Sequence, residues 1–246
     1  MLEEPFTGGA VSHVVPAGDK VLKIQWPHRE SEHEAAALAL WDGDGAVRLL
    51  AHDEERHALL LERCRPGTQL REAGPSEALD VRTELLPRLW RPAGAPFRPL
   101  AEEAAWWASY IHDEWDAAGR PFEEELADAA VAALETLGPT QGEQVLLHQD
   151  LHADNVLAAR REPWLAIDPK PLAGEREFGL APIIRSFELG HSESAVLSRL
   201  DVLTSSLGLD RERARGWALG QTIAWSAGGE FQARHVETAR WLLQAG

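Results

Sequence analysis

The feature that most constrains the fold is a change of pattern near residue 63. Before it, short β-branched and leucine-rich runs alternate with turn residues, and one Ala- and Leu-rich stretch follows Pro27. This pattern predicts two strands joined by a Pro-Ala-Gly-Asp turn, a helix over 31–41 capped by Ser31, and two more strands over 46–52 and 57–63. We therefore expect a small antiparallel-sheet lobe.

After Cys64-Arg65-Pro66-Gly67 the composition becomes helical. Ala-, Leu- and Glu-rich stretches predict helices over 76–90, 100–118 and 121–138, and the chain returns to helix after about residue 168. The pattern is typical of an α+β protein with two lobes. We expect a small lobe over 1–63 and a mostly helical lobe over 64–246.

A short β-rich island over 144–168 interrupts the helical half. The runs NVLAA (155–159) and WLAID (164–168) flank a turn at 160–163, which predicts a hairpin in which Asn155 faces Asp168. Because the turn type is open, this register can slip by one residue. An amide oxygen and a carboxylate at one end of a hairpin, with Asp150 just upstream, are the oxygen ligands that Mg²⁺ on a polyphosphate requires.

The composition of the chain limits the classes of partner that it is expected to bind. The chain carries 40 acidic against 24 basic side chains, a net charge of −16, which disfavours nucleic acid and anionic membranes and suits a cationic small molecule or simply a solvated acidic surface. One cysteine excludes an internal disulfide, and no apolar run is long enough to span a membrane. We expect a cytoplasmic protein, and no feature indicates a protein partner.

The alternation of His148, Asp150, His152 and Asp154 also fits a zinc hydrolase. Such a site needs further ligands, and the remaining histidines are scattered and unpaired. We therefore disfavour this interpretation.

The segments HQDLHADN (148–155) and IDPK (167–170) resemble the catalytic motifs of the aminoglycoside phosphotransferase family, closest to its streptomycin 6-kinase and hydroxyurea-resistance kinase group. The similarity extends over nearly the whole chain, through TGGAVSHVV, VLKIQWP, SEHEAAAL, WDGDGAVRLL and LLLERCRPG. It implies a protein-kinase-like fold, with a small nucleotide-binding lobe, truncated at its start, and a helical lobe that carries a catalytic hairpin and the acceptor site. It also implies ATP and Mg²⁺ as cofactors.

The resemblance assigns roles in the catalytic loop. It makes Asp150 the catalytic residue that accepts the proton of the acceptor hydroxyl, and Asn155 and Asp168 the Mg²⁺ ligands. It makes His148 and His152 structural residues that orient the loop.

It also assigns the nucleotide contacts. Lys23 would reach the α- and β-phosphates, paired with Glu34, or else with Glu32 or Glu30. Gly8 and Gly9, after Thr7, would cover the phosphates, and the backbone from Glu62 to Cys64 would hold the adenine.

Three departures from the family pattern bear on activity. The chain starts at Met1, so the strand that leads into the glycine turn is short. Gly179 stands where the family typically has an aspartate that supports the catalytic loop, and Glu175 or Glu177 is a candidate to compensate. Gln149 replaces a glycine.

The resemblance implies an ATP- and Mg²⁺-dependent kinase that adds phosphate to a hydroxyl of a streptomycin-like aminocyclitol and so confers antibiotic resistance. Its cationic acceptor would meet carboxylates, for which Asp113, Glu114, Asp116 and Glu230 are candidates. The alternatives are a kinase for another small hydroxylated metabolite and a catalytically impaired nucleotide-binding relative. A protein kinase proper is disfavoured because D-F-G and A-P-E segments are absent.

Overall fold

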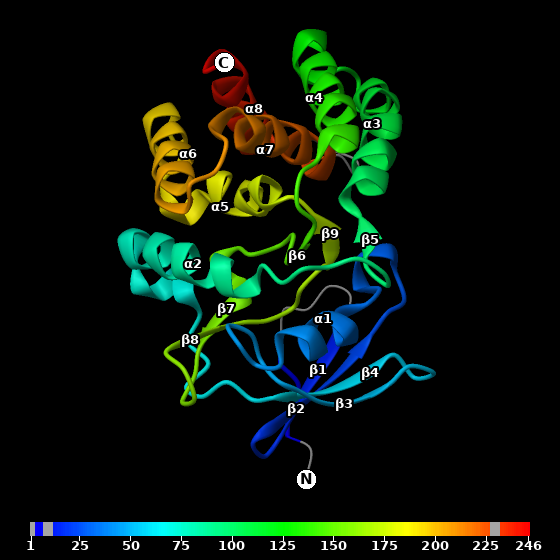
Figure 1. Cartoon of the computed structure of the whole chain (residues 1–246), viewed down its shortest axis with the longest axis vertical. Helices are drawn as coiled ribbons and strands as arrows, with labels where there is room; N and C mark the ends of the chain where they lie inside the picture. Colours follow the sequence, from blue (N-terminus) through cyan, green and yellow to red (C-terminus); the bar gives the residue numbers. More distant parts are fainter. Residues whose placement is uncertain (1–2, 7–11, 227–231) are drawn as a thin grey trace.

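A four-stranded antiparallel sheet forms the N-terminal part of the protein. The computed structural model describes residues 3–6, 12–226 and 232–246. Within them the strands run in the order β1-β2-β4-β3 (Figure 1). Their bounds are β1 Ser12–Ala17, β2 Lys20–Gln25, β3 Leu49–Asp53 and β4 Ala58–Glu62. The predicted antiparallel sheet is therefore confirmed, although β3 begins three residues later than expected.

Helix α1 (Glu34–Trp41) lies between this sheet and the rest of the protein (Figure 1). It buries Leu38 and Trp41 completely in the core. The predicted start at Ser31 is wrong, because residues 29–31 form a short 3₁₀ turn in which the Ser31 hydroxyl donates to the carbonyl of His28 at 2.8 Å. The backbone then turns through a left-handed conformation at His33 before α1 begins.

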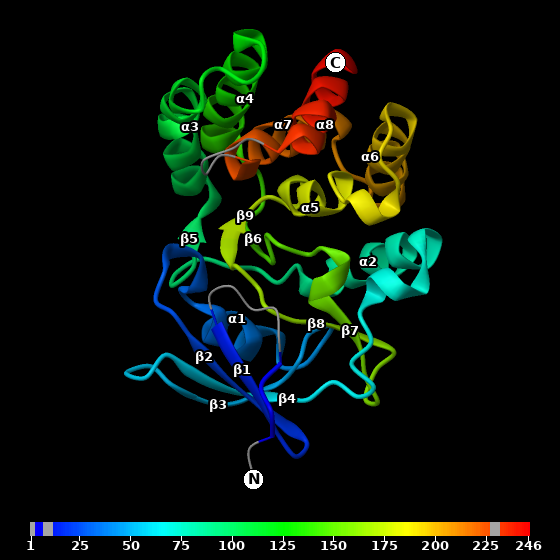
Figure 2. The same cartoon turned by 180° about the vertical axis from the view of Figure 1, so that it is seen from behind.

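The C-terminal part is mostly helical, as the composition predicts. Helices α3 and α4 pair along one side, α6 lies on the other, and α7 runs between them (Figures 1 and 2). Within the described residues, the α-helices of this part are α2 Pro75–Leu89, α3 Leu100–Ala117, α4 Glu124–Leu137, α5 Ala181–Ile184, α6 Glu193–Leu207, α7 Arg211–Ser226 and α8 Ala233–Gln244. The middle of α7 is buried on every side because α4, α5 and α8 pack around it.

The β island forms two small sheets beneath these helices. Strands β6 (Val145–Leu147), β9 (Leu172–Gly174) and β5 (Arg98–Pro99) make one, and the hairpin β7 (Val156–Ala158) and β8 (Trp164–Ala166) makes the other.

The hairpin register differs from the predicted one by one residue. Val156 pairs with Ala166, and the carbonyl of Asn155 accepts the N–H of Ile167 at 2.9 Å. Asn155 therefore faces Ile167 rather than Asp168. The reason lies in the turn, where the N–H of Ala159 donates to the carbonyl of Pro163 at 3.3 Å. Pro163 thus belongs to the ladder, and the turn proper is one residue shorter than expected.

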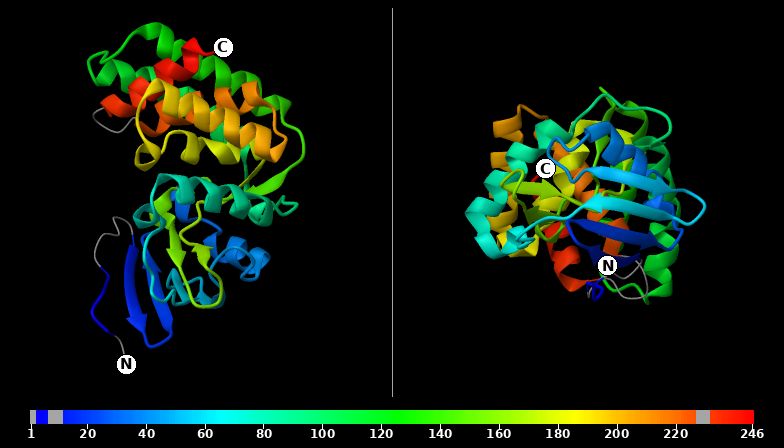
Figure 3. Two further views of the ribbon diagram at one scale, coloured as in Figure 1. Left: turned by 90° about the vertical axis from the view of Figure 1, so that its left-hand side faces the viewer. Right: turned by 90° about the horizontal axis from the view of Figure 1, so that it is seen from below.

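The hairpin also contacts the N-terminal part. Ala166 donates to the carbonyl of Gly45 at 2.9 Å and accepts from Val47 at 3.0 Å. At the hairpin tip, Arg161 donates to the Glu62 carboxylate at 2.9 Å and to the carbonyl of Ala46 at 3.0 Å. Figure 3 shows β7 and β8 beside the N-terminal sheet. These contacts place the polar end of the hairpin between the two halves of the protein, while the domain boundary at 63/64 stays a prediction. No described helix is both long and apolar enough to cross a membrane.

Candidate active site

Lys23 is the buried cation of the N-terminal sheet. Its side chain projects from β2, and its ammonium donates to the two oxygens of Glu34 at 2.9 and 2.7 Å. The same ammonium contacts the Asp168 carboxylate. Burial works against the charged form, but the two carboxylates outweigh it and raise the pKa of Lys23. The structure therefore brings Lys23, Glu34 and Asp168 together across 145 residues of sequence.

The alternatives to Glu34 point elsewhere. Glu32 pairs with Arg98, and Glu30 lies 3.2 Å from the ammonium of Lys170. Of the three glutamates proposed as partners, Glu34 alone contacts Lys23 among the described residues.

The loop 148–155 holds Asp150 and Asn155 close together. The amide nitrogen of Asn155 donates to the Asp150 carbonyl at 2.9 Å and lies 3.4 Å from its carboxylate. Gln149, just before Asp150, has a left-handed backbone (φ 63°), a conformation for which glycine is the favoured residue. Although Gln149 replaces a glycine, the backbone at this position has the conformation that glycine favours.

Asp150 is buried among basic side chains. Its carboxylate lies 3.0 Å from the ammonium of Lys170 and 3.7 Å from Nε2 of His152. Burial favours the neutral acid, but Lys170, His152 and Arg185 together hold the pKa of Asp150 below its usual range. Asp150 is thus an ionised carboxylate at neutral pH, which is the form that can accept a proton or orient a hydroxyl.

His148 is a neutral structural histidine. Its Nε2 lies 2.9 Å from the carbonyl of Ile167, which makes Nε2 the protonated nitrogen, and its ring stacks on Trp41 at 6.0 Å. Burial lowers the pKa of His148 to about 4. His152 caps the turn that follows, because its Nδ1 accepts the N–H of Asp154 at 3.2 Å. Of the two ring nitrogens of His148, Nε2 is engaged by the carbonyl of Ile167, and Nδ1 is buried and has no polar partner among the described residues.

Gly179 lies behind the catalytic loop. A β-carbon built at this position would meet Nε1 of Trp90 at 3.2 Å and a methyl of Leu147 at 3.6 Å. A carboxylate at 179 would place an acceptor beside the indole N–H of Trp90.

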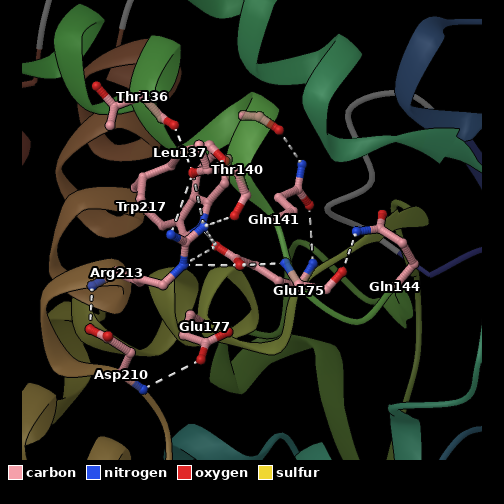
Figure 4. A network of polar contacts seen from close by, with 12 residues as sticks. Thr136, Leu137, Thr140, Gln141, Gln144, Glu175, Glu177, Asp210, Arg213 and Trp217 are labelled. Atoms are coloured by element: carbon pink, nitrogen blue, oxygen red, sulfur yellow. Dashed lines mark hydrogen bonds and ion pairs between the residues drawn. The ribbon is translucent and has the colours of Figure 1, made fainter.

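Glu175 and Glu177 do not take over that role. The buried carboxylate of Glu175 accepts from the Arg213 guanidinium at 2.8 Å and from the indole of Trp217 (Figure 4). Glu177 accepts the N–H of Asp210 at 3.3 Å. Both belong to a network that fixes the start of α7, and neither contacts residues 148–155 within the described part of the chain.

The expected adenine contacts lie in the link between the halves. Glu62 ends β4, and its N–H donates to the carbonyl of Arg48 at 2.9 Å. Cys64 follows two residues later, half-buried, and burial raises the pKa of its thiol to about 12. The adenine role of this backbone stays a prediction. Gly8 and Gly9 lie outside the described residues.

The oxygen donors at the hairpin end fit a magnesium ion. Asn155 uses its nitrogen for Asp150, which leaves its amide oxygen available, and the carboxylate of Asp168 is 46% exposed. Neutral and anionic oxygens are the ligands that Mg²⁺ prefers. The described residues contain no cluster of three or more His, Cys, Asp or Glu side chains suited to a metal, so the zinc interpretation gains no support.

Sequence reasoning missed several residues around Asp150. Lys170 and Arg185 both lie on the ring of Trp225, at 4.9 and 4.5 Å from its centre. Arg185 also donates to Gln221 at 2.7 Å, and burial lowers its pKa to about 10. Only the scarcity of lysine, three among 24 basic residues, could have drawn attention to Lys170.

The chain is similar to known proteins in both sequence and structure. Residues 7–229 match the family described as aminoglycoside/hydroxyurea antibiotic resistance kinase. A streptomycin 6-kinase of Streptomyces griseus is 40% identical over 87% of this chain and 74% of that protein. A hydroxyurea phosphotransferase of Kitasatospora aureofaciens is 43% identical over 83% of this chain, and this chain spans 60% of its length.

Solved structures share the fold. The choline kinase LicA of Streptococcus pneumoniae superposes with a TM-score of 0.69 at 15% identity, over 99% of this chain and 92% of that one, and it has also been solved with AMP. The expected protein-kinase-like fold is therefore confirmed.

Proposed function

Because the chain belongs to the aminoglycoside/hydroxyurea antibiotic resistance kinase family and is a small-molecule kinase, we propose that it transfers the γ-phosphoryl group of ATP to a hydroxyl of a streptomycin-like aminocyclitol. The observation that carries the proposal is that two clusters of polar side chains lie at the end of the β7–β8 hairpin. One cluster consists of Lys23, Glu34 and Asp168. The other consists of Asp150 and Asn155.

In the proposed mechanism Lys23 binds the α- and β-phosphates and Glu34 fixes its position. Phosphoryl transfer depends mainly on positioning and on neutralising charge. Because two carboxylates raise the pKa of Lys23, its ammonium stays charged at every physiological pH. It can therefore bind the phosphates while it remains paired with Glu34. Asn155 and Asp168 would hold Mg²⁺, which neutralises phosphate charge when bound.

Asp150 orients the acceptor hydroxyl and accepts its proton. The lowered pKa of Asp150 suits this role, because the carboxylate is ionised at neutral pH. Its burial excludes bulk water, which favours transfer to the acceptor over hydrolysis of ATP.

The acceptor is proposed to bind beside α3. Trp106, Tyr110 and Glu114 recur at every fourth residue and so share one face of this helix. Trp106 packs on Tyr110 at 5.1 Å, and the Tyr110 hydroxyl donates to the carbonyl of Ala224 at 3.2 Å. Burial, with the carboxylates of Glu103, Glu30 and Glu114, raises the pKa of Tyr110.

Aromatic rings beside carboxylates are well suited to guanidinium groups, and the guanidinium of Arg29 already lies over the ring of Trp106, 4.5 Å from its centre. Of the candidate carboxylates, Glu114 fits best, because Asp116 is paired with Arg120 and Asp113 is on the exposed side. Glu230 lies outside the described residues.

A second acceptor class is a small uncharged hydroxyl compound such as hydroxyurea. The presence of two cations near Asp150, Lys170 and Arg185, favours this class. A neutral acceptor is not repelled by these cations, whereas a cationic acceptor is. The 43% identity to a hydroxyurea phosphotransferase agrees with this choice.

The test is mass spectrometry of streptomycin and, separately, of hydroxyurea after incubation with the protein, ATP and Mg²⁺. We expect a phosphorylated streptomycin that is absent when AMP-PNP replaces ATP. Phosphate on hydroxyurea alone would select the second acceptor class. If neither compound gains phosphate while Mg·ATP still binds, the proposed acceptors are wrong.

A further inference from the structure

The side chain of Arg29 reaches from the turn before α1 to the start of α3. Its guanidinium donates to one carboxylate oxygen of Glu103 at 3.0 and 2.8 Å and lies over the ring of Trp106, 4.5 Å from its centre. The carboxylate of Glu102 lies 3.7 Å from the same guanidinium. The chain thus holds one of its own guanidinium groups between an indole and two carboxylates, on the helix proposed above to bind the acceptor.

Glu103 has a second cation that is held more firmly. Arg98 donates to the same oxygen of Glu103 at 2.8 Å and to the backbone carbonyl of Arg29 at 2.7 Å. The side chain of Arg98 is 10% exposed, whereas that of Arg29 is 33% exposed. A buried carboxylate that loses its only partner is strongly destabilising, and Arg98 prevents this for Glu103. The side chain of Arg29 can therefore leave without uncovering Glu103 or releasing the turn that carries it.

This contact lies near the catalytic loop. Glu30, the neighbour of Arg29, lies 3.2 Å from the ammonium of Lys170, and that ammonium lies 3.0 Å from the carboxylate of Asp150. Two ion pairs thus lead from the turn that carries Arg29 to the group assigned to the acceptor hydroxyl. A molecule that takes the place of the Arg29 guanidinium is within reach of the surroundings of Asp150.

The guanidinium of Arg29 indicates which class of ligand fits this position. A guanidinium is planar and always charged, stacks on aromatic faces and donates in parallel to carboxylates. A position that holds one such group through an indole and carboxylates suits another of the same shape. The guanidinium groups of a streptomycin-like aminocyclitol have this shape, whereas an uncharged acceptor such as hydroxyurea gains nothing from the exchange.

We propose that the start of α3 carries a guanidinium subsite for the acceptor, formed by Trp106 with Glu102 and Glu103. The side chain of Arg29 fills this subsite until the acceptor displaces it. The inference rests on the proposed function, because it takes the acceptor to be a guanidinium-bearing aminocyclitol. Arg29 then determines specificity, since an acceptor gains the subsite only when its own cation competes with the internal one, and this competition lowers the apparent affinity.

The first test measures streptomycin binding by calorimetry with Mg²⁺ and AMP-PNP present, so that no turnover is needed. Arg29→Gln should lower the Kd for streptomycin about two- to fivefold, as expected when one exposed cation–π contact no longer competes. Arg120→Gln is the matched control, because Arg120 lies 5.0 Å from the ring centre of Trp115 of the same helix and pairs with Asp116. It should leave the Kd unchanged.

Two further variants separate displacement from a change of net charge. Arg29→Lys keeps the charge but loses the planar fork that donates twice to Glu103, so it should lower the Kd by a smaller factor. In Trp106→Leu, streptomycin should bind more weakly than in the wild type, and adding Arg29→Gln should improve binding less, because the shared ring is gone. An equal gain from Arg29→Gln with and without the ring would assign the effect to charge and overturn the subsite.

The second test follows the displacement itself by ¹H–¹⁵N NMR, because an indole ring shields a guanidinium that lies over it. The Nε–H signal of Arg29 is assigned by its loss in Arg29→Lys. Saturating streptomycin should move this signal to the position of a solvent-exposed arginine. Hydroxyurea at the same concentration should leave it in place.

The outcomes separate this inference from the proposed function. If streptomycin is phosphorylated while the Arg29 signal stays in place, the subsite is wrong and the proposed function stands. If streptomycin displaces Arg29 but gains no phosphate, the subsite stands and the proposed function fails. If streptomycin does not bind, both are wrong. A Kd in Arg29→Gln that equals the value in Arg120→Gln also overturns the role of Arg29.

Discussion

The burial of His148 predicts a pH-dependent stability that can be worked out from the structure. The imidazole stacks on Trp41 and its pKa is lowered from 6.5 to about 4, because burial disfavours the charged ring. Between these values the unfolded chain binds a proton that the folded protein does not. The contribution is therefore fully present above pH 6.5 and is lost as the pH falls toward 4. At about 1.4 kcal/mol per pKa unit the loss is about 3 kcal/mol.

The assay is urea unfolding at several pH values between 4.5 and 7.5. His148→Gln is the matched variant, because a glutamine can still donate to the carbonyl of Ile167 and does not titrate. We expect the free energy of unfolding of the wild type to fall more steeply with acidification than that of His148→Gln. Most of the difference of about 3 kcal/mol should develop between pH 6.5 and 4.5.

His235 is a second source of acid sensitivity, since burial lowers its pKa to about 4 as well. The comparison is therefore repeated in a His235→Gln background. Parallel pH curves for the wild type and His148→Gln, in either background, would refute the conclusion that His148 is neutral in the folded protein.

Two further predictions concern the metal ligand and the loop support. Asp168→Ala should abolish the effect of Mg²⁺ on ATP affinity in calorimetric titrations, because a metal ligand is lost; unchanged Mg²⁺ dependence would move the metal site elsewhere. Gly179→Asp should raise Tm by a few degrees, roughly 2–4 °C per kcal/mol for a chain of this length, because a carboxylate there gains a donor from the indole of Trp90. Gly179→Ala is the control, and an equal rise in it would assign the effect to packing.

The order of strands and helices could be predicted because it depends on local signals. Turn residues and apolar periodicity mark the strands up to Glu62, and Ala- and Leu-rich stretches mark α2, α3 and α4. The register of the β7–β8 hairpin could not be fixed, because it depends on whether Pro163 joins the ladder. The start of α1 was missed because Ser31 bonds backward to His28 instead of capping the helix.

The residues of the site divide in the same way into those that local sequence signals predict and those that depend on contacts between distant segments. Asp150, Asn155 and Asp168 stand in contiguous motifs, so resemblance could point to them. The partner of Lys23 could only be narrowed to three glutamates, since 3₁₀ geometry at 29–31 decides which carboxylate turns inward. Lys170 went unrecognised because its partners lie 20 and 140 residues away, and no local pattern encodes such contacts.

The most direct test of the account is the rate of streptomycin phosphorylation by Asp150→Asn. The substitution keeps the size of the side chain and removes its charge. We predict that ATP affinity and thermal stability stay near the wild-type values while kcat falls at least about a hundredfold, as expected for loss of a general base. Turnover at the wild-type rate would contradict the central claim that Asp150 activates the acceptor hydroxyl.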